Sequence, residues 1–337
     1  MHPLRFAQFP PVSFPGLNGG KPIDASRSDI KRALLMVGYP TRMAAEMVVG
    51  PWRTHMLASL VRGYLRDDLT FSPYFWNLEP SERGTVSFLL AQAYTMWAAQ
   101  EHLEMTYMTH VKGCGHSYAK SGSGAVTAKQ GGNVPNGKSL PDFIGVDTSG
   151  RYHVFESKGR SRPAGSSSLV GTMIDSCLPH ALGQVASITA VLGGAPRSRT
   201  ASVWIFAEDG PHGRLVDPEA GDGWLLNFKP WLAARKAYWV FLDRRKPLIE
   251  LDDRYVGIRL PDGDSLGIDR RLLKLLQAPD QRSPIEITDF LGSRRGEYLD
   301  TRGREWAKTS VGLDGTILIP RDGRARGWPP GLPRLAR

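Results

Sequence analysis

Two carboxylates and a lysine fall within one short stretch of this sequence, residues 141–160, which reads PDFIGVDTSGRYHVFESKGR. They are Asp142, Glu156 and Lys158. A carboxylate pair, with water and phosphate oxygens, is a ligand set that Mg²⁺ accepts. A bound metal polarises a phosphoryl group and lowers the pKa of its water, and a neighbouring lysine can hold that water or stabilise charge on the phosphate. These residue types indicate metal-dependent phosphate-ester hydrolysis, if the fold brings them together.

A β-hairpin would bring them together. Two β-prone runs flank residues 148–150 (Thr-Ser-Gly), and a three-residue hairpin loop commonly ends in a left-handed glycine. Counting outward from this turn places Asp142 directly opposite Glu156. Opposed side chains share a face with their Cβ atoms about 5 Å apart. Strand alternation puts Lys158 on that face too.

The same register sets the character of each face of the hairpin. Ile144 is opposite Val154 on the carboxylate face, and Phe143 is opposite Phe155 on the other face. Because both faces are largely apolar, we expect helices to cover the sheet on both sides. Opposed carboxylates on an apolar face repel each other and are costly to desolvate, and a divalent cation removes that penalty. The alternative interpretation is an exposed hairpin end with an ordinary Glu–Lys ion pair.

Pro141-Asp142, followed after a hairpin by Glu156-Ser157-Lys158, resembles the signature of the PD-(D/E)XK nuclease superfamily, which has the restriction-endonuclease-like fold. The order of the expected elements over residues 80–245 also resembles that fold. We expect a helix over 82–104, a strand near 105–111, the two hairpin strands, a helix over 173–192 and a strand over 202–207.

The resemblance implies a role for each matching residue. Asp142 and Glu156 would ligate Mg²⁺ or Mn²⁺, together with the backbone carbonyl of Ser157, and Lys158 would position the nucleophilic water.

Many members of the superfamily carry two further polar side chains. Gln184, alone among apolar residues in HALGQVASI, fits the position on the helix after the lysine strand, with a capped or solvent-facing glutamine as the alternative. An acid on the first helix is also common, and Glu82, Glu101 and Glu104 remain open for that role.

Other candidate motifs in the sequence give weaker indications of function. The pairs Pro261-Asp262 and Pro279-Asp280 have no Glu-x-Lys at hairpin distance. The chain has no glycine-rich phosphate loop and no G-x-S-x-G nucleophile motif. Five residues that could bind zinc match no standard spacing: His110, Cys114, His116, Cys177 and His180.

The chain is basic, with a net charge of +10 and a pI near 9.7. Residues 111–200 hold ten basic and four acidic side chains, so much of the excess surrounds the hairpin. A basic balance favours a polyanionic partner, nucleic acid before membrane. We expect phosphate contacts from five residues near the hairpin, with solvated side chains as the alternative: Lys112, Lys129, Lys138, Arg160 and Arg162.

The remaining composition bounds the location and the fold class. Two cysteines, no signal-like apolar run at the N-terminus and no run of 18 apolar residues predict a cytoplasmic protein without a membrane span. We expect an α/β protein: an irregular N-terminal arm (1–26) and helical region to residue 80, a nuclease core over 81–245 with a mixed central sheet flanked by helices, and a β-rich extension with a basic tail over 246–337. We also expect a helix over 231–239, a strand over 240–242, and hairpin turns at 262–263 and 314–315.

The functional expectation is a Mg²⁺-dependent endonuclease, with DNA favoured over RNA. The family's habits suggest prokaryotic defence or mobile-element processing. The alternatives are a catalytically silent nucleic-acid-binding subunit with a nuclease-like fold, and a nuclease toxin or effector. A homodimer or a partner subunit remains open.

Overall fold

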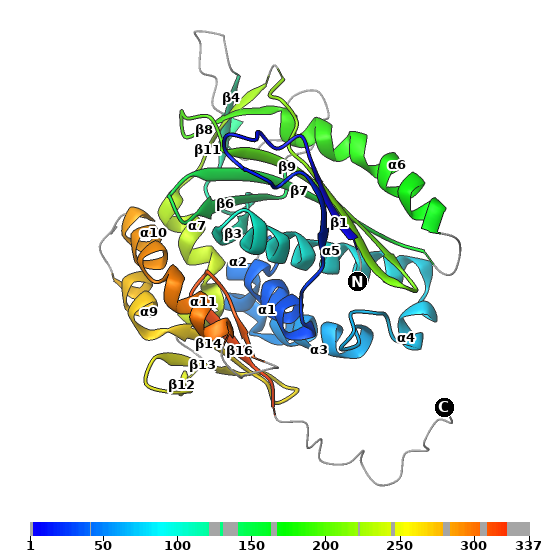
Figure 1. Cartoon of the computed structure of the whole chain (residues 1–337). Helices are drawn as coiled ribbons and strands as arrows, with labels where there is room; N and C mark the ends of the chain where they lie inside the picture. Colours follow the sequence, from blue (N-terminus) through cyan, green and yellow to red (C-terminus); the bar gives the residue numbers. More distant parts are fainter. Residues whose placement is uncertain are drawn as a thin grey trace.

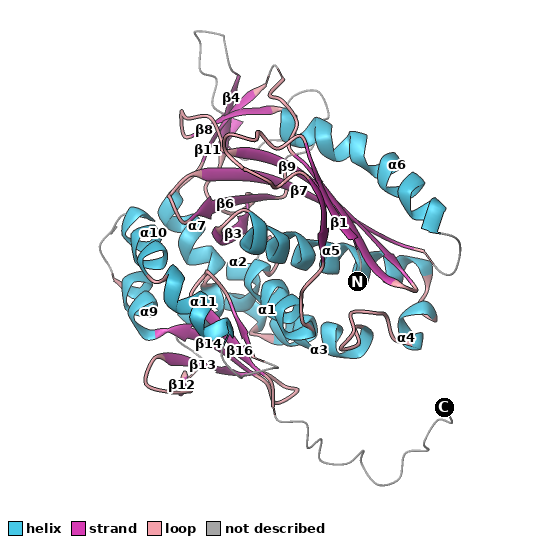
Figure 2. Cartoon of the chain, viewed as in Figure 1, coloured by secondary structure: helices cyan, strands magenta, loops and turns pink. Residues whose placement is uncertain are grey.

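The computed structural model describes residues 3–40, 42–120, 129–130, 141–162, 167–221, 223–243, 247–278, 284–303 and 309–321. A mixed seven-stranded sheet, flanked by helices, has the strand order β2-β1-β10-β9-β7-β6-β3 (Figures 1 and 2). Its strands are β1 (Pro3–Ala7), β2 (Gly19–Pro22), β3 (Met105–His110), β6 (Phe143–Asp147), β7 (Tyr152–Ser161), β9 (Ser198–Ala207) and β10 (Gly210–Val216).

The strands that carry the motif form an antiparallel meander, β3-β6-β7, and β9 runs parallel to β7. Parallel neighbours need a crossover connection, and here α6 (Ser167–Ala186) supplies it and packs on β9 and β7. Helix α5 (Pro80–His102) packs on β7 from the other face of the sheet (Figure 1). The meander therefore lies between two helices.

Each face of the sheet has its own apolar core, as the register predicts. Phe143 and Phe155 belong to the core on the α5 side, whereas Ile144 and Val154 belong to the core on the α6 side. All four side chains are buried. Gly150 at the hairpin turn has φ 76°, the left-handed conformation that the loop type requires. The predicted hairpin and its covering on both faces are confirmed.

Helices and two smaller sheets surround this centre. The helices are α1 (Arg27–Val37), α2 (Arg42–Val49), α3 (Trp52–Tyr64), α4 (Pro73–Trp76), α7 (Pro230–Ala237), α8 (Trp239–Leu242), α9 (Arg270–Gln277), α10 (Pro284–Ser293) and α11 (Arg295–Gly303). One small sheet contains β4 (Ser117–Lys120), β5 (Lys129–Gln130), β8 (Ile188–Val191) and β11 (Trp224–Asn227). An antiparallel five-stranded sheet contains β12 (Ile249–Glu250), β13 (Tyr255–Arg259), β14 (Ser265–Asp269), β15 (Ser310–Val311) and β16 (Thr316–Ile319).

A buried arginine connects the N-terminal helices, the central helix and the C-terminal sheet. Arg32 of α1 donates to both carboxylate oxygens of Asp314, at 3.0 and 3.1 Å, and to Gln100 Oε1 of α5 at 2.8 Å. Removing one member of a buried charge pair leaves the other unpaired, which is strongly destabilising. The described parts of the three predicted regions therefore contact one another through this cluster.

Several expectations about single elements were wrong. The N-terminal arm is not irregular, because β1 pairs with β2 and, in parallel, with β10 in the central sheet. The helix expected to reach residue 192 ends at Ala186, where the β-branched run of β8 begins. The apolar run expected as a strand at 240–242 lies in helix α8, since a short apolar run does not distinguish strand from helix.

Other expectations were confirmed. Helix α5 and strand β3 lie within two residues of their predicted bounds. Gly263 and Gly315 have positive φ in the two expected hairpin turns. No helix in the described ranges is long and apolar enough to cross a membrane.

The closest approach between α5 and the sheet generates a stability prediction. A Cβ added at Gly159 of β7 would overlap the Ser87 carbonyl oxygen and lie 2.7 Å from Ala91 Cβ. We expect Gly159→Ala to destabilise the protein by about 2–4 kcal/mol, because the helix must move away from the strand. Gly183→Ala on α6, where a Cβ meets nothing within 4 Å, is the matched control and should be neutral or slightly stabilising. Urea unfolding of the two variants tests this, and equal midpoints would contradict the close packing.

Candidate active site

Asp142 and Glu156 meet at the open end of the β6–β7 hairpin. The paired residues run from Val146–Tyr152 to Phe143–Phe155, so the next pair is Asp142–Glu156, as the sequence predicts. The Asp142 N–H donates to Glu156 Oε2 over 3.0 Å, and the Ser157 N–H donates to Asp142 Oδ2 over 3.0 Å. Each carboxylate thus accepts a backbone hydrogen bond from the opposite strand, which fixes both groups.

Lys158 extends this pair toward solvent. Its ammonium group contacts Glu156 Oε1. The Glu156 side chain is 1% exposed and that of Lys158 is 28% exposed, so the cation is the accessible member. Lys158 lines a groove of about 1040 Å³ whose other lining residues come from β7, α5 and α6: Ser81, Gly84, Thr85, Phe88, Gly159, Arg160, Ser161, Met173, Ser176, Cys177 and His180.

Burial governs the protonation of the two carboxylates. It raises the pKa of Asp142, and burial together with the charge of Asp142 raises the pKa of Glu156 to about 7, against the opposing effect of Lys158. Near neutral pH the pair therefore retains a proton in part of the molecules. A divalent cation would favour the doubly ionised state and displace that proton.

The backbone of Ser157 adds a third oxygen at the same place. The Ser157 N–H points toward the β6 side, where it meets Asp142, and in an extended strand the carbonyl of the same residue points to that side as well. The register places Pro141 opposite Ser157, and proline has no N–H to donate to that carbonyl. The Ser157 hydroxyl lies on the other face, 3.1 Å from Thr95 Oγ1 of α5, so of the two Ser157 oxygens it is the carbonyl that the register places on the side of Asp142.

These donors fit a hard divalent cation. Two carboxylates and one carbonyl form an all-oxygen set, which suits Mg²⁺ or Mn²⁺. In the described part of the chain, no group of three or more His, Cys, Asp and Glu side chains could hold a metal ion. The protein would therefore contribute two side chains and a backbone oxygen, as in Mg²⁺ sites that retain several waters. No three of the candidate zinc residues gather in the described part of the chain, and both cysteines are free.

Lys236 of α7 is a site residue that the sequence did not reveal. Its buried ammonium group donates to the carbonyls of His110, at 2.8 Å, and Lys112. Between them, the Val111 N–H donates to the Asp142 carbonyl over 3.0 Å. Lys236 therefore holds residues 110–112 in place, and Val111 of that segment holds Asp142. Burial lowers the pKa of Lys236 to about 8. A lysine inside the apolar stretch around 231–239 was the available signal.

Gln184 is placed on the helix that covers the carboxylate face. Its side chain is 4% exposed, between Ala181 and Val185 of the α6-side core. The alternative of a solvent-facing glutamine is therefore wrong. Its predicted role toward the reacting groups stays a prediction.

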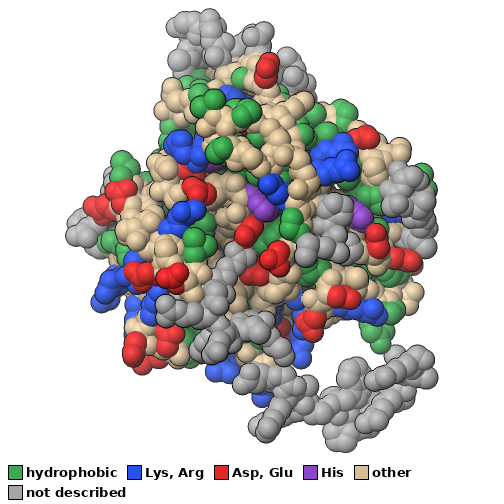
Figure 3. All heavy atoms as spheres, in the orientation of Figure 1, with side chains coloured by type: hydrophobic (Ala, Val, Ile, Leu, Met, Phe, Trp, Pro, Cys, Tyr) green, Lys and Arg blue, Asp and Glu red, His purple; other side chains and the backbone are tan. Residues whose placement is uncertain are grey.

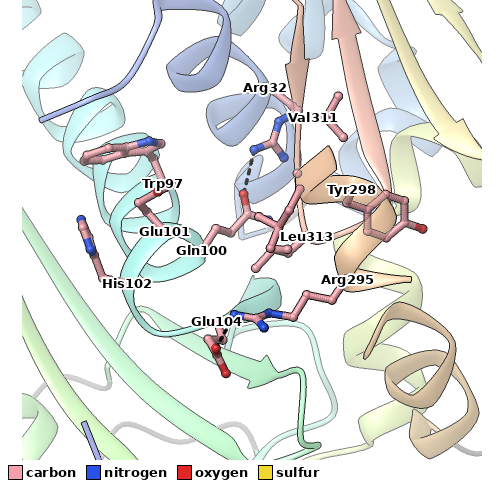
Figure 4. A pocket seen from close by; sticks show the side chains of 12 residues that line it. Arg32, Trp97, Gln100, Glu101, His102, Glu104, Arg295, Tyr298, Val311 and Leu313 are labelled. Carbon is pink, nitrogen blue, oxygen red and sulfur yellow. Dashed lines mark hydrogen bonds and ion pairs between the residues drawn. The ribbon is translucent and has the colours of Figure 1, made fainter. Parts of the chain in front are cut away.

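Of the three candidate first-helix acids, Glu82 and Glu101 lie in α5, whereas Glu104 follows the end of that helix at His102. Glu101 and Glu104 line a separate cavity of about 160 Å³, where Glu104 pairs with Arg295 at 2.6 Å (Figure 4). Glu104 also accepts a backbone hydrogen bond from Thr148 at the hairpin turn, roughly 20 Å along the strands from Asp142. Glu82 is exposed in the first turn of α5, next to the groove residues Ser81 and Gly84. Of the three, Glu82 is therefore nearest in the chain to groove-lining residues.

The five basic residues predicted to contact phosphate also lie in different parts of the structure. Arg160 lines the groove, and Arg162 follows it at the end of β7. Lys112 is exposed beside the segment that holds Asp142. Lys129 lies in β5, but its side chain and the whole of Lys138 fall outside the described residues. On the face drawn in Figure 3, basic and acidic side chains are interspersed rather than segregated.

Comparison with known proteins adds no second line of argument. The chain matches no known family model, no characterised protein and no solved structure.

The raised pKa of Glu156 predicts a pH-dependent stability difference. A carboxyl group whose pKa is higher in the folded state contributes stability at low pH and loses it as the pH rises from about 4.5 to about 7. In chelator, we expect Glu156→Gln to gain on the order of 2 kcal/mol relative to wild type between pH 5 and pH 8. Urea unfolding at both pH values measures this gain.

The matched control for this comparison is Glu219→Gln, which changes an exposed carboxylate away from the site. The stability difference between this variant and wild type should be the same at both pH values. A Glu156→Gln difference that is likewise independent of pH would contradict the buried, coupled carboxylate pair.

Proposed function

We propose that this chain is a metal-dependent nuclease of the PD-(D/E)XK type that hydrolyses phosphodiester bonds in DNA. The observation that carries the proposal is the opposed pair Asp142 and Glu156, in which each carboxylate accepts a backbone N–H from the other strand, with Lys158 beside Glu156 lining an open groove. The order helix, antiparallel meander, helix, parallel strand supports the same fold family.

The residues divide the proposed chemistry between them. Asp142, Glu156 and the Ser157 carbonyl would hold Mg²⁺ or Mn²⁺, which when bound polarises the phosphate and lowers the pKa of its water. The Lys158 ammonium group, fixed by Glu156, would orient the attacking water and neutralise charge on the phosphate oxygens. Arg160 in the same groove would bind the adjacent backbone phosphate.

The surrounding elements keep this arrangement rigid. The opposed acids lie against apolar helix-covered layers, so their charges interact in a medium of low polarity. Lys236 maintains the backbone of the segment beside Asp142. Such fixed groups need little reorganisation during the reaction, which is the main advantage of a preorganised site.

The first test of this function is metal binding without turnover. At pH 8, Mg²⁺ or Mn²⁺ at about ten times its dissociation constant should stabilise the wild-type protein by about 1.4 kcal/mol. Glu156→Gln should lose most of this stabilisation, because one carboxylate ligand is replaced by a neutral amide. Thermal unfolding with and without metal measures the effect, and equal shifts in the two proteins would refute the ligand assignment.

The second test is cleavage of supercoiled plasmid DNA. We expect wild-type protein to nick or linearise the plasmid with Mg²⁺ or Mn²⁺ and not in chelator. Glu156→Gln and Lys158→Met should each lower the rate by about 100-fold or more, since each removes a group aimed at charge in the transition state. Glu219→Gln, which changes an exposed acid away from the groove, should cut normally.

Two results would contradict the proposed activity. Equal cleavage by all four proteins would indicate a contaminating nuclease. Binding of the plasmid without cleavage under any of these metals would favour a silent nucleic-acid-binding subunit.

A further inference from the structure

A second groove lies in the C-terminal part of the chain, beside α9, α10 and α11, helices that Figure 1 places at the opposite side of the molecule from α6. It has a volume of about 410 Å³ between the β13–β14 hairpin, α9 and the α10–α11 junction. Every residue that lines it is charged, five basic and three acidic: Asp253, Arg254, Asp269, Arg270, Arg271, Lys274, Arg294 and Glu297. The groove therefore has an ionic lining with a basic excess.

Two acidic residues of the groove already form hydrogen bonds and ion pairs within the protein. Asp269 accepts from Arg254 Nε at 3.1 Å and caps α9 through the Arg271 N–H at 2.9 Å. Glu297 pairs with Arg294 at 2.7 Å and with Arg254 at 3.4 Å. These contacts hold Arg254 and Arg294 in place, and Arg270 pairs with Glu250 beside the groove at 3.0 Å, so Arg271 and Lys274 are the lining cations that form no ion pair with a described residue.

Arg254 is the most constrained of these cations. Its guanidinium group lies over the rings of Tyr255 and Tyr298, 5.2 and 4.7 Å from their centroids. Stacking of this kind fixes a guanidinium plane before any ligand arrives. Because its Nε and Nη1 already meet Asp269 and Glu297, Arg254 shapes the groove and leaves Arg271 and Lys274 to meet an anion.

The groove also holds donors that are not used within the described residues. Arg254 Nη2, Arg270 Nε and Arg294 Nε are buried, and no described residue accepts a hydrogen bond from them. An N–H without an acceptor costs free energy, and a small shift that let a ligand oxygen or an ordered water accept from these buried nitrogens would recover it. Phosphate oxygens are the acceptors that arginine forks match best.

Two of the five lining cations, Arg271 and Lys274, are exposed on α9. Arg271 and Lys274 are three residues apart on one helix face, which places their Cβ atoms about 5–6 Å apart. Long side chains at this spacing can reach successive phosphates of one strand. No apolar side chain lines the groove, whereas surfaces that bind membranes also insert apolar side chains.

We propose that this charged groove binds the sugar-phosphate backbone of the nucleic acid on which the protein acts. This inference rests on the proposed function, and it adds a binding site outside the cleavage groove. The ligand is a polymer rather than a single phosphate, because the two unpaired lining cations lie side by side on the exposed face of α9, where each can meet a different phosphate.

The test measures DNA binding without cleavage. Glu156→Gln protein in chelator is titrated with a labelled duplex of about 30 base pairs at several salt concentrations. Adding Arg271→Ala and Lys274→Ala should weaken binding about 10-fold at moderate salt, and the slope of log K against log salt should become shallower by about two. Alanine favours the helix, and unchanged thermal unfolding would show that α9 is intact.

The matched control is the pair Arg5→Ala and Arg66→Ala, which removes the same charge from exposed positions elsewhere. It should leave the salt slope close to that of the parent. Equal slopes in the parent and the α9 double variant would overturn the proposal. Inorganic phosphate that competes with the DNA at the same phosphate concentration would also overturn it. So would a parallel titration with anionic lipid vesicles in which the α9 substitutions weaken vesicle binding and leave DNA binding unchanged.

These outcomes are separable from those of the proposed function. A reduced slope in the α9 variant would support the groove even if the wild-type protein cut no DNA. Metal-dependent cutting with an unchanged slope would leave the nuclease proposal standing and remove this one.

Discussion

The site depends on one physical arrangement, in which two strand ends present opposed carboxylates and each carboxylate accepts a backbone N–H from the other strand. Asp142 and Glu156 would repel each other on an apolar face if both were ionised. The two hydrogen bonds of 3.0 Å hold them there, and burial raises both pKa values. The candidate site is thus a place where the fold accepts an electrostatic cost that a divalent cation would relieve.

The surrounding elements hold the two carboxylates in this electrostatically unfavourable arrangement. Gly159 lets α5 pack closely on β7, and this packing fixes the position of the strand that carries Glu156 and Lys158. Lys236 holds the end of β3, and that end holds Asp142. Pro141 leaves the Ser157 carbonyl without a donor from the ladder. Helices cover both faces of the hairpin, so Glu156 is buried and Asp142 is only partly exposed, while Lys158 still reaches the groove.

The sequence was sufficient wherever the determining interactions are local. The turn glycine at 150 and the alternation of the flanking residues gave the register, the two apolar faces and the opposed acids. It was insufficient where partners are distant: β1 pairs with β10 some 200 residues later, and Lys236 contacts a segment near residue 110. The charged C-terminal groove likewise combines residues 253–297 from four elements, so no short motif could have revealed it.

The most direct test of the central claim is calorimetric titration of the chain with Mn²⁺ near pH 7 in buffers of different ionisation enthalpy. Binding should saturate at one ion per chain and release a fraction of a proton. This release should fall toward zero above pH 8, where both carboxylates are already ionised. Glu156→Gln should abolish the proton release and weaken binding. Binding of equal strength in that variant, or no binding in the wild-type protein, would contradict the account.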